Sequence, residues 1–128
     1  LGLQRVSFEG YQQPLPYYQR AKIFLMTSAF EGFGMTLVES LQQGVVPVVM
    51  DSFSSLHDIV KDGYNGRIVE EGDISGFAKA VTELMENSKM RNAMVMNGLE
   101  SSRLFSVEKV VDRWQRLLSS MTSDMGGQ

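Results

Sequence analysis

Two unbroken apolar runs of strand length constrain what this chain can fold into more than any other feature of its sequence. Residues 23–26 and 45–50 contain no polar side chain. A strand without a polar face has to be covered on both sides, which is typical of parallel sheets with helices on each face. Residues 67–69 form a third, shorter strand candidate, and residues 6–8 alternate as a short strand does.

Segments of helical length separate and follow these runs. The pattern predicts helices at residues 17–21, 35–43, 55–61, 74–85 with Asp73 as N-cap, 90–104 and 106–118. Strands that alternate with helices favour right-handed crossovers and a doubly wound, Rossmann-like parallel α/β sheet, here followed by a helix-rich C-terminus. Such sheets bind ligands outside the carboxyl ends of their strands, so we expect a site in the loops after Phe8, Met26 and Met50.

Length and composition narrow the classes of function. The 128 residues suit one domain, which we expect to span residues 1–120, with a tail at 121–128 that frays from Ser119. No apolar run approaches the roughly 20 residues that a membrane-spanning helix needs. The net charge of −3 provides no sequence-wide basic field for nucleic acid. Without cysteine, and with His57 as the only histidine, the sequence favours no metal site.

The most informative stretch leaves the first apolar run and enters a helix. Gly32 and Gly34 flank Phe33 just before that helix, where glycine lets the backbone approach a ligand closely. The first amides of a helix lack partners within it, so those of Gly34, Met35, Thr36 and Leu37 are expected to be free. Free amides at the positive end of a helix dipole are suited to a phosphate group.

Two carboxylates bracket this turn. Glu31 precedes it and Glu39 follows on the helix, with seven residues between them. The helical rise from Gly34 to Glu39 is about 7 to 8 Å, which places the two acids at opposite ends of an extended ligand. Because a carboxylate has two acceptor oxygens, it can recognise the vicinal hydroxyls of a ribose or a hexose.

Five segments, in order and spacing, resemble the retaining family 4 glycosyltransferases, which have the two-domain GT-B fold. Residues 31–39 are similar to the family's motif of two glutamates separated by seven residues. Residues 6–10 resemble its "V-x-F-x-G" strand, and residues 18–28 its next helix and strand. Residues 43–49 are similar to "A-x-G-x-P-V-V" and residues 62–69 to "D-G-x-N-G-x-L-V".

The resemblance implies the C-terminal, nucleotide-sugar-binding domain of such an enzyme, without its first strands and its N-terminal domain. It implies transfer of a hexosyl unit, with retention, from a nucleoside-diphosphate sugar to a saccharide or lipid-linked acceptor, as in polysaccharide biosynthesis. No cofactor or metal is implied. A cytoplasmic location is implied, with contact to the cytoplasmic face of the membrane through the missing domain. We expect this chain alone to be inactive and to bind donor weakly, because the family's basic residues for the diphosphate lie upstream.

Residue roles follow from the matched motif. The family's first glutamate contacts the donor sugar, its helix-start amides hold the diphosphate, and its second glutamate binds the ribose diol. By that match, Glu31 is the expected catalytic residue. The expected donor-binding residues are Gly32, Phe33, Gly34, Met35, Thr36, Leu37 and Glu39.

Other interpretations remain open. Where many family members carry a Gly-Gly pair and a glutamate near the donor phosphates, this sequence has Ser54, Ser55 and Asp58. Asp51 suits either a ligand site at the end of a strand or a simple turn, and His57 is explained more simply by a surface helix than by a catalytic base. A non-catalytic module of the same fold, for binding a nucleotide or a partner, is the alternative function. A glycosidase would also use two carboxylates, but no hydrolytic cleft is indicated.

Overall fold

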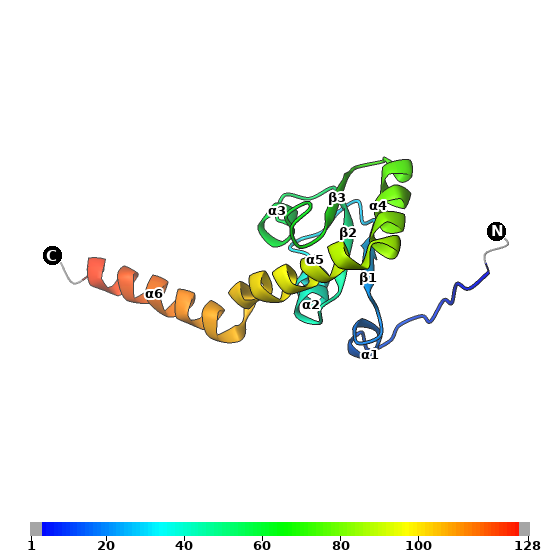
Figure 1. Cartoon of the computed structure of the whole chain (residues 1–128). Coiled ribbons are helices and arrows are strands. Elements are labelled where there is room, and N and C mark those ends of the chain that lie inside the picture. The colour runs from blue at the N-terminus through cyan, green and yellow to red at the C-terminus, as the bar shows by residue number, and fades with distance from the viewer. Residues whose placement is uncertain (1–3, 126–128) are drawn as a thin grey trace.

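The computed structural model describes residues 4–125, and the side chains of residues 4–122. Three parallel strands form one sheet in the order β1 (Ile23–Met26), β2 (Val46–Asp51) and β3 (Arg67–Glu70). Each strand is connected to the next through a helix, as the apolar runs predicted. Figure 1 shows the sheet enclosed by helices, with the last helix extending away from it.

Helices cover both faces of the sheet. They are α1 (Leu15–Tyr18), α2 (Met35–Gln42), α3 (Leu56–Ile59), α4 (Ile74–Glu86), α5 (Ser88–Ser102), the 3-10 turn η1 (Arg103–Phe105) and α6 (Val107–Met125). Helices α2 and α3 contribute to the hydrophobic cluster on one face, and α4 and α5 contribute to the cluster on the other. The predicted doubly wound α/β architecture is confirmed.

The middle strand explains why its sequence has no polar face. Val48 and Met50 pack with Phe77 and Leu84 in the cluster formed with α4 and α5. Val49, between them, lies in the opposite cluster beside α2 and α3. Successive side chains of a strand point to opposite faces, so a strand between two helical layers has to be apolar at every position.

The turn before β3 is fixed by a buried amide. Asn65 is 1% exposed, and its Oδ1 accepts the Lys61 amide at 2.7 Å. Its Nδ2 donates to the Ile59 carbonyl at 3.0 Å and to Ser101 Oγ at 2.9 Å, which ties the turn to α5. A Cβ at the following Gly66 would lie 2.8 Å from Val60 and Pro47, so only glycine fits. This part of the matched motif therefore serves folding.

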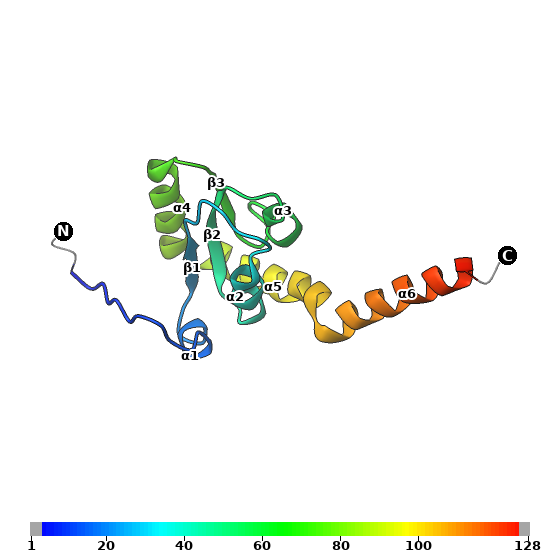
Figure 2. The same ribbon diagram turned by 180° about the vertical axis from the view of Figure 1, so that it is seen from behind.

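Two elements differ in kind from the sequence prediction, and the helix expected at residues 17–21 instead lies earlier, as α1 at Leu15–Tyr18. Residues 6–8 form no strand; they belong to an arm that leads away from the sheet (Figure 1), and Phe8 is 91% exposed. A strand needs a neighbour to accept its hydrogen bonds, and none lies beside this arm in residues 4–125. The tail expected to fray from Ser119 is helical as far as Met125, because no glycine or proline interrupts α6 there. Figure 2 shows the arm and α6 extending in opposite directions.

Candidate functional site

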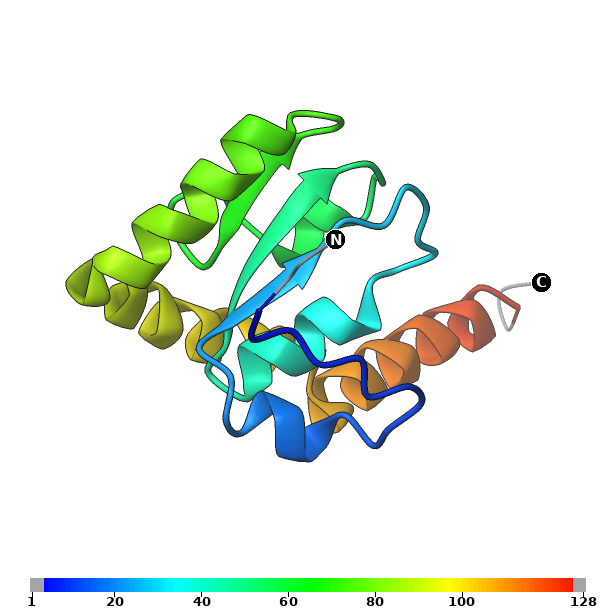
Figure 3. The ribbon, with the colours of Figure 1, turned by 90° about the vertical axis from the view of Figure 1, so that its right-hand side faces the viewer.

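The carboxyl ends of β1 and β2 lie at one edge of the sheet. The strands are in register there, with Met26 opposite Val49. Figure 3 shows both arrows pointing toward this edge, where the loops at residues 27–34 and 52–55 leave the sheet. This is the edge at which a doubly wound sheet binds ligands, and two of the three loops singled out from the sequence meet there.

Helix α2 begins at this edge without a side-chain cap. Its N-cap residue, Gly34, lies in the left-handed region with φ 87° and ψ 47°. A Cβ at this position would stand 3.2 Å from the Phe53 ring, so both the backbone conformation and the packing favour glycine. Among residues 4–125, the backbone amides of Gly34, Met35 and Thr36 donate to no acceptor. Three peptide N–H groups thus remain free at the positive end of the helix dipole.

The fourth expected amide donor, that of Leu37, is not free. It donates to the Gly34 carbonyl at 2.9 Å, which closes the first turn of α2 with a short 3-10 hydrogen bond. The Leu37 side chain is fully buried in the cluster between α2, α3 and the sheet. The prediction of a free amide at this position is therefore wrong, and Leu37 anchors the start of the helix to the core.

Two serines tie the two loops together. Ser52 Oγ donates to the Ser28 carbonyl at 2.5 Å. Ser55 Oγ lies 3.3 Å from the Gly32 carbonyl and 3.2 Å from the Phe33 carbonyl. These contacts use carbonyl oxygens of the turn and leave its amides unoccupied. Ser55 therefore braces the turn from the neighbouring loop.

Glu31 is unengaged at the loop side of this turn. The carboxylate is partly exposed and has no hydrogen-bond or ion-pair partner among the residues the structure describes. Phe33, two residues further on, is 40% exposed, and its ring meets Phe105 edge to face at a centroid distance of 5.9 Å. The turn is thus supported by η1, while the carboxylate of Glu31 stays available to a ligand.

Glu39 has a different environment. It is half-buried, and its Oε2 accepts a hydrogen bond from the Tyr18 hydroxyl at 3.3 Å. It lines a depression of about 250 Å³ between α1 and α2, to which Glu31 does not contribute. Burial raises the pKa of Tyr18 to about 12, and the charge and the hydrogen bond of Glu39 add to the increase. The phenol therefore stays protonated, as a donor, at neutral pH.

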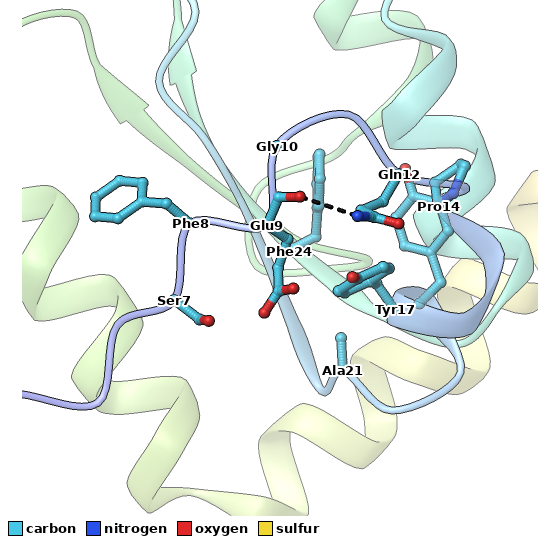
Figure 4. A pocket seen from close by; sticks show the side chains of 10 residues that line it. Ser7, Phe8, Glu9, Gly10, Gln12, Pro14, Tyr17, Ala21 and Phe24 are labelled. Carbon is cyan, nitrogen blue, oxygen red and sulfur yellow. Dashed lines mark hydrogen bonds between the residues drawn. The ribbon is translucent and has the colours of Figure 1, made fainter.

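A larger cavity of about 630 Å³ lies between the N-terminal arm, α1 and β1. Tyr17, Tyr18 and Phe24 contribute aromatic rings to it. Figure 4 shows Phe8 pointing away from Tyr17 and Phe24, while Gln12 donates to the Glu9 carbonyl at 3.0 Å across the arm. The loop after residue 8, expected to be a ligand loop, thus borders this cavity and not the start of α2.

Asp51 and His57 form a pair at the end of β2. Asp51 Oδ1 lies 2.9 Å from His57 Nε2, and the two side chains are 45% and 56% exposed. Both groups are well hydrated, and an exposed pair of this kind contributes little to stability. The pair lies at the ligand edge of the sheet, but it contacts neither Glu31 nor Glu39.

Residues 4–125 contain no group of three or more histidine, aspartate or glutamate side chains that could hold a metal ion. No helix in that range is long and apolar enough to cross a membrane.

A family model described as "glycosyl transferases group 1" matches residues 1–101. This chain belongs to that family. One relative is the lipopolysaccharide core biosynthesis glycosyltransferase LpsE of Rhizobium meliloti, 33% identical over 118 residues, which are 91% of this chain and 34% of LpsE. Another is the poly(glycerol-phosphate) alpha-glucosyltransferase of Bacillus subtilis, 27% identical over 91% of this chain and 17% of the relative. The chain therefore spans about a third or less of the length of these relatives.

Solved glycosyltransferases share the fold. HepE of Anabaena, crystallised in complex with UDP, superposes with a TM-score of 0.84 at 24% identity, over 91% of this chain and 32% of HepE. The C-terminal domain of LpcC, a group 1 glycosyl transferase of Francisella tularensis, gives a TM-score of 0.66 at 23% identity, over 82% of this chain and 53% of that domain. Membership of a glycosyltransferase family and the predicted Rossmann-like fold of a GT-B C-terminal domain are confirmed, while retention and the assignment to family 4 stay predictions.

Sequence reasoning missed two residues of the site. The sequence patterns give Tyr18 no role in the site, although its hydroxyl contacts Glu39, and they mark Ser55 only as a departure from the family pattern. Tyr18 and Glu39 are 21 residues apart in the chain, and Ser55 and Phe33 are 22 apart. No local spacing rule connects residues so far apart, so only the packing of α1 on α2 and of loop on loop could have revealed these contacts.

Proposed function

We propose that this chain is the donor-binding domain of a retaining glycosyltransferase. The enzyme would transfer a hexosyl unit from a nucleoside-diphosphate sugar to a saccharide or lipid-linked acceptor. The observation that carries the proposal is the uncapped start of α2, with three free amides between Glu31 and Glu39. Membership of the glycosyl transferase family supports the proposal, as does the similarity to HepE, which was crystallised in complex with UDP.

Each part of the donor has a proposed partner. The amides of Gly34, Met35 and Thr36 bind the diphosphate, since charge-assisted hydrogen bonds of this kind contribute about 1.5 to 3 kcal/mol each. Glu31, without a partner of its own, accepts hydroxyls of the donor sugar. Glu39 accepts the diol of the ribose. No metal cofactor is part of the proposal.

The proposed reaction proceeds on one face of the sugar. The bond between the anomeric carbon and the diphosphate oxygen breaks, and the acceptor oxygen bonds to the same face of that carbon. The proton of the acceptor hydroxyl passes to the departing phosphate. The contribution of this domain is to position the donor and to stabilise the charge that develops on the leaving diphosphate. The acceptor would bind to an N-terminal domain, in the cytoplasm at the inner face of a membrane.

Calorimetric titration of the full-length protein with uridine, guanosine and adenosine diphosphate sugars tests the proposal. One donor should bind, and both Glu39→Ala and Glu31→Gln should weaken that binding about tenfold or more. Glu71→Gln is the matched control, because Glu71 is exposed in the turn after β3. Unchanged binding in both site variants would contradict the residue assignment.

The anomeric configuration of the product, measured by NMR, tests retention separately. A product with the configuration of the donor supports the same-face reaction, and an inverted product contradicts it. A full-length protein that binds donor but transfers no sugar to saccharide or lipid-linked acceptors would instead support the non-catalytic alternative.

A further inference from the structure

Tyr18 connects α1 to two points on α2. Its hydroxyl lies 3.3 Å from Glu39 Oε2 and 3.3 Å from the Thr36 carbonyl oxygen, so a single proton is shared between the two acceptors. The side chain is 7% exposed, and its ring packs edge to face on Phe24 of β1 at a centroid distance of 5.9 Å. A phenol fixed in this way cannot follow the carboxylate if Glu39 rotates. The contact therefore restrains the Glu39 carboxylate.

The restraint leaves the carboxylate able to bind a ligand. An ionised carboxylate has two oxygens and about four lone-pair positions, and Tyr18 occupies only one of them. Oε1 has no partner among residues 4–125. The side chain borders a depression with Gln13, Gln42 and Gln43, so it is not sealed in the core. Oε1 and the remaining positions on Oε2 are free to accept two hydroxyl protons.

We propose that Tyr18 is a positioning residue for donor binding: its hydroxyl holds Glu39 in the orientation that accepts the ribose diol. Tyr18 itself does not touch the ligand. The inference rests on the proposed function of Glu39 and adds a residue of α1 to the donor site. Pre-organisation of this kind raises affinity because less side-chain freedom is lost on binding.

A purely structural role for Tyr18 predicts something different. In that case its hydroxyl would serve only to satisfy the Thr36 carbonyl and to join α1 to α2. Removing the hydroxyl would then lower the stability of the fold without changing the preference for a ribonucleotide over its 2′-deoxy form. The preference for ribose over 2′-deoxyribose distinguishes the two roles. Under the positioning role, Glu39 binds the 2′-hydroxyl well only when Tyr18 fixes the orientation of its carboxylate.

NMR titration of the ¹⁵N-labelled chain, which detects millimolar affinity, tests the proposal. The ligands are the diphosphates of uridine, guanosine and adenosine, each compared with its 2′-deoxy counterpart. The wild-type chain should bind its preferred ribonucleotide about tenfold more tightly than the deoxy form. Tyr18→Phe should reduce that ratio to about threefold or less and leave deoxynucleotide binding within about twofold. Glu39→Gln should abolish the preference, so that the ribonucleotide and the deoxynucleotide bind about equally well.

Tyr17→Phe is the matched control. Tyr17 is the adjacent tyrosine, its ring lies under Arg20, and its hydroxyl donates to no described residue. This variant should keep the wild-type ratio. If Tyr18→Phe does not fold, the ring signals of Tyr18 in the wild-type chain replace it: the ribonucleotide should shift them, and the deoxynucleotide should not.

The outcomes separate the two levels of the argument. A full ribose preference in Tyr18→Phe, together with its loss in Glu39→Gln, overturns the role of Tyr18 and leaves the proposed function intact. Equal shifts of the Tyr18 ring by both nucleotides overturn that role as well. A preference that survives Glu39→Gln overturns the assignment of Glu39, and with it this inference. No saturable binding of any nucleotide by the wild-type chain removes the nucleotide site altogether.

Discussion

Helix α2 and helices α4 and α5 begin in opposite ways. At α4, Asp73 Oδ1 accepts the Gly76 amide at 2.8 Å, and at α5, Asn87 Oδ1 accepts the Met90 amide at 2.9 Å. At α2 the N-cap is Gly34, which has no side chain to offer. Glycine in place of a capping side chain costs a helix only about a few tenths of a kcal/mol, so α2 can begin without a side-chain cap at little loss of stability. Under the proposed function, the first amides of α2 are left free for a ligand, while those of α4 and α5 serve the fold.

The largest effect should come from adding a side chain at Gly34. Gly34→Ala places a Cβ in the left-handed region, 3.2 Å from the Phe53 ring, so the free energy of unfolding should fall by about 2 to 3 kcal/mol. Binding of a nucleoside diphosphate should weaken as well, because the turn has to shift. Urea denaturation and NMR titration measure the two effects.

Gly72→Ala is the matched control at the start of α4. Gly72 has a similar φ of +84°, but no atom lies within 4 Å of the added Cβ. It should lower stability by only about 1 to 2 kcal/mol and leave nucleotide binding unchanged. Equal effects of both variants on binding would remove the distinction between the two helix starts.

Removing the caps of α4 and α5 should have an intermediate effect. Asp73→Ala and Asn87→Ala should each lower the free energy of unfolding by about 1 kcal/mol, because each leaves an amide at the helix start without its acceptor. Neither change should alter nucleotide affinity. Urea denaturation with a parallel NMR titration checks both statements, and a weakened nucleotide affinity in Asp73→Ala would show that α4 takes part in the site.

The smallest effect concerns the brace that α2 receives from Tyr18. The folded state raises the pKa of this phenol from 10.0 to about 12. A raised pKa means that the stabilising contribution is complete below pH 10 and is lost as the pH rises through about 12. The stability difference between wild type and Tyr18→Phe should therefore be constant from neutral pH to pH 10 and then shrink. Thermal unfolding at a series of pH values measures it; a difference unchanged up to pH 12 would contradict the burial of the Tyr18 hydroxyl beside Glu39.

The layered fold could be predicted because its cause is local. Apolar runs at β1 and β2 demand cover on both faces, and the helical segments between them provide it. The surface against which the apolar face of each helix packs was less predictable. Helices α4 and α6 show the same apolar spacing, yet Leu84 of α4 is fully buried, whereas Trp114 of α6 is 59% exposed. Periodicity predicts that a helix has an apolar face, but not which surface meets that face.

The candidate site was predictable to a similar extent. The two glycines before α2 and the two glutamates around them indicated an open helix start from sequence alone, and the structure leaves three of the four expected amides free. The fourth, at Leu37, was missed because a 3-10 bond to Gly34 depends on the exact path of the turn. The strand expected at residues 6–8 was wrong because alternation cannot say whether a neighbouring strand is present.

Titration of the ¹⁵N-labelled chain with inorganic pyrophosphate tests the central claim most directly, because this ligand carries the charge of a diphosphate without sugar or base. The account predicts saturable shifts of the amide signals of Gly34, Met35 and Thr36. Ile74 and Ser75, at the capped start of α4, should not respond. Shifts of similar size at both helix starts, or none at α2, would contradict it.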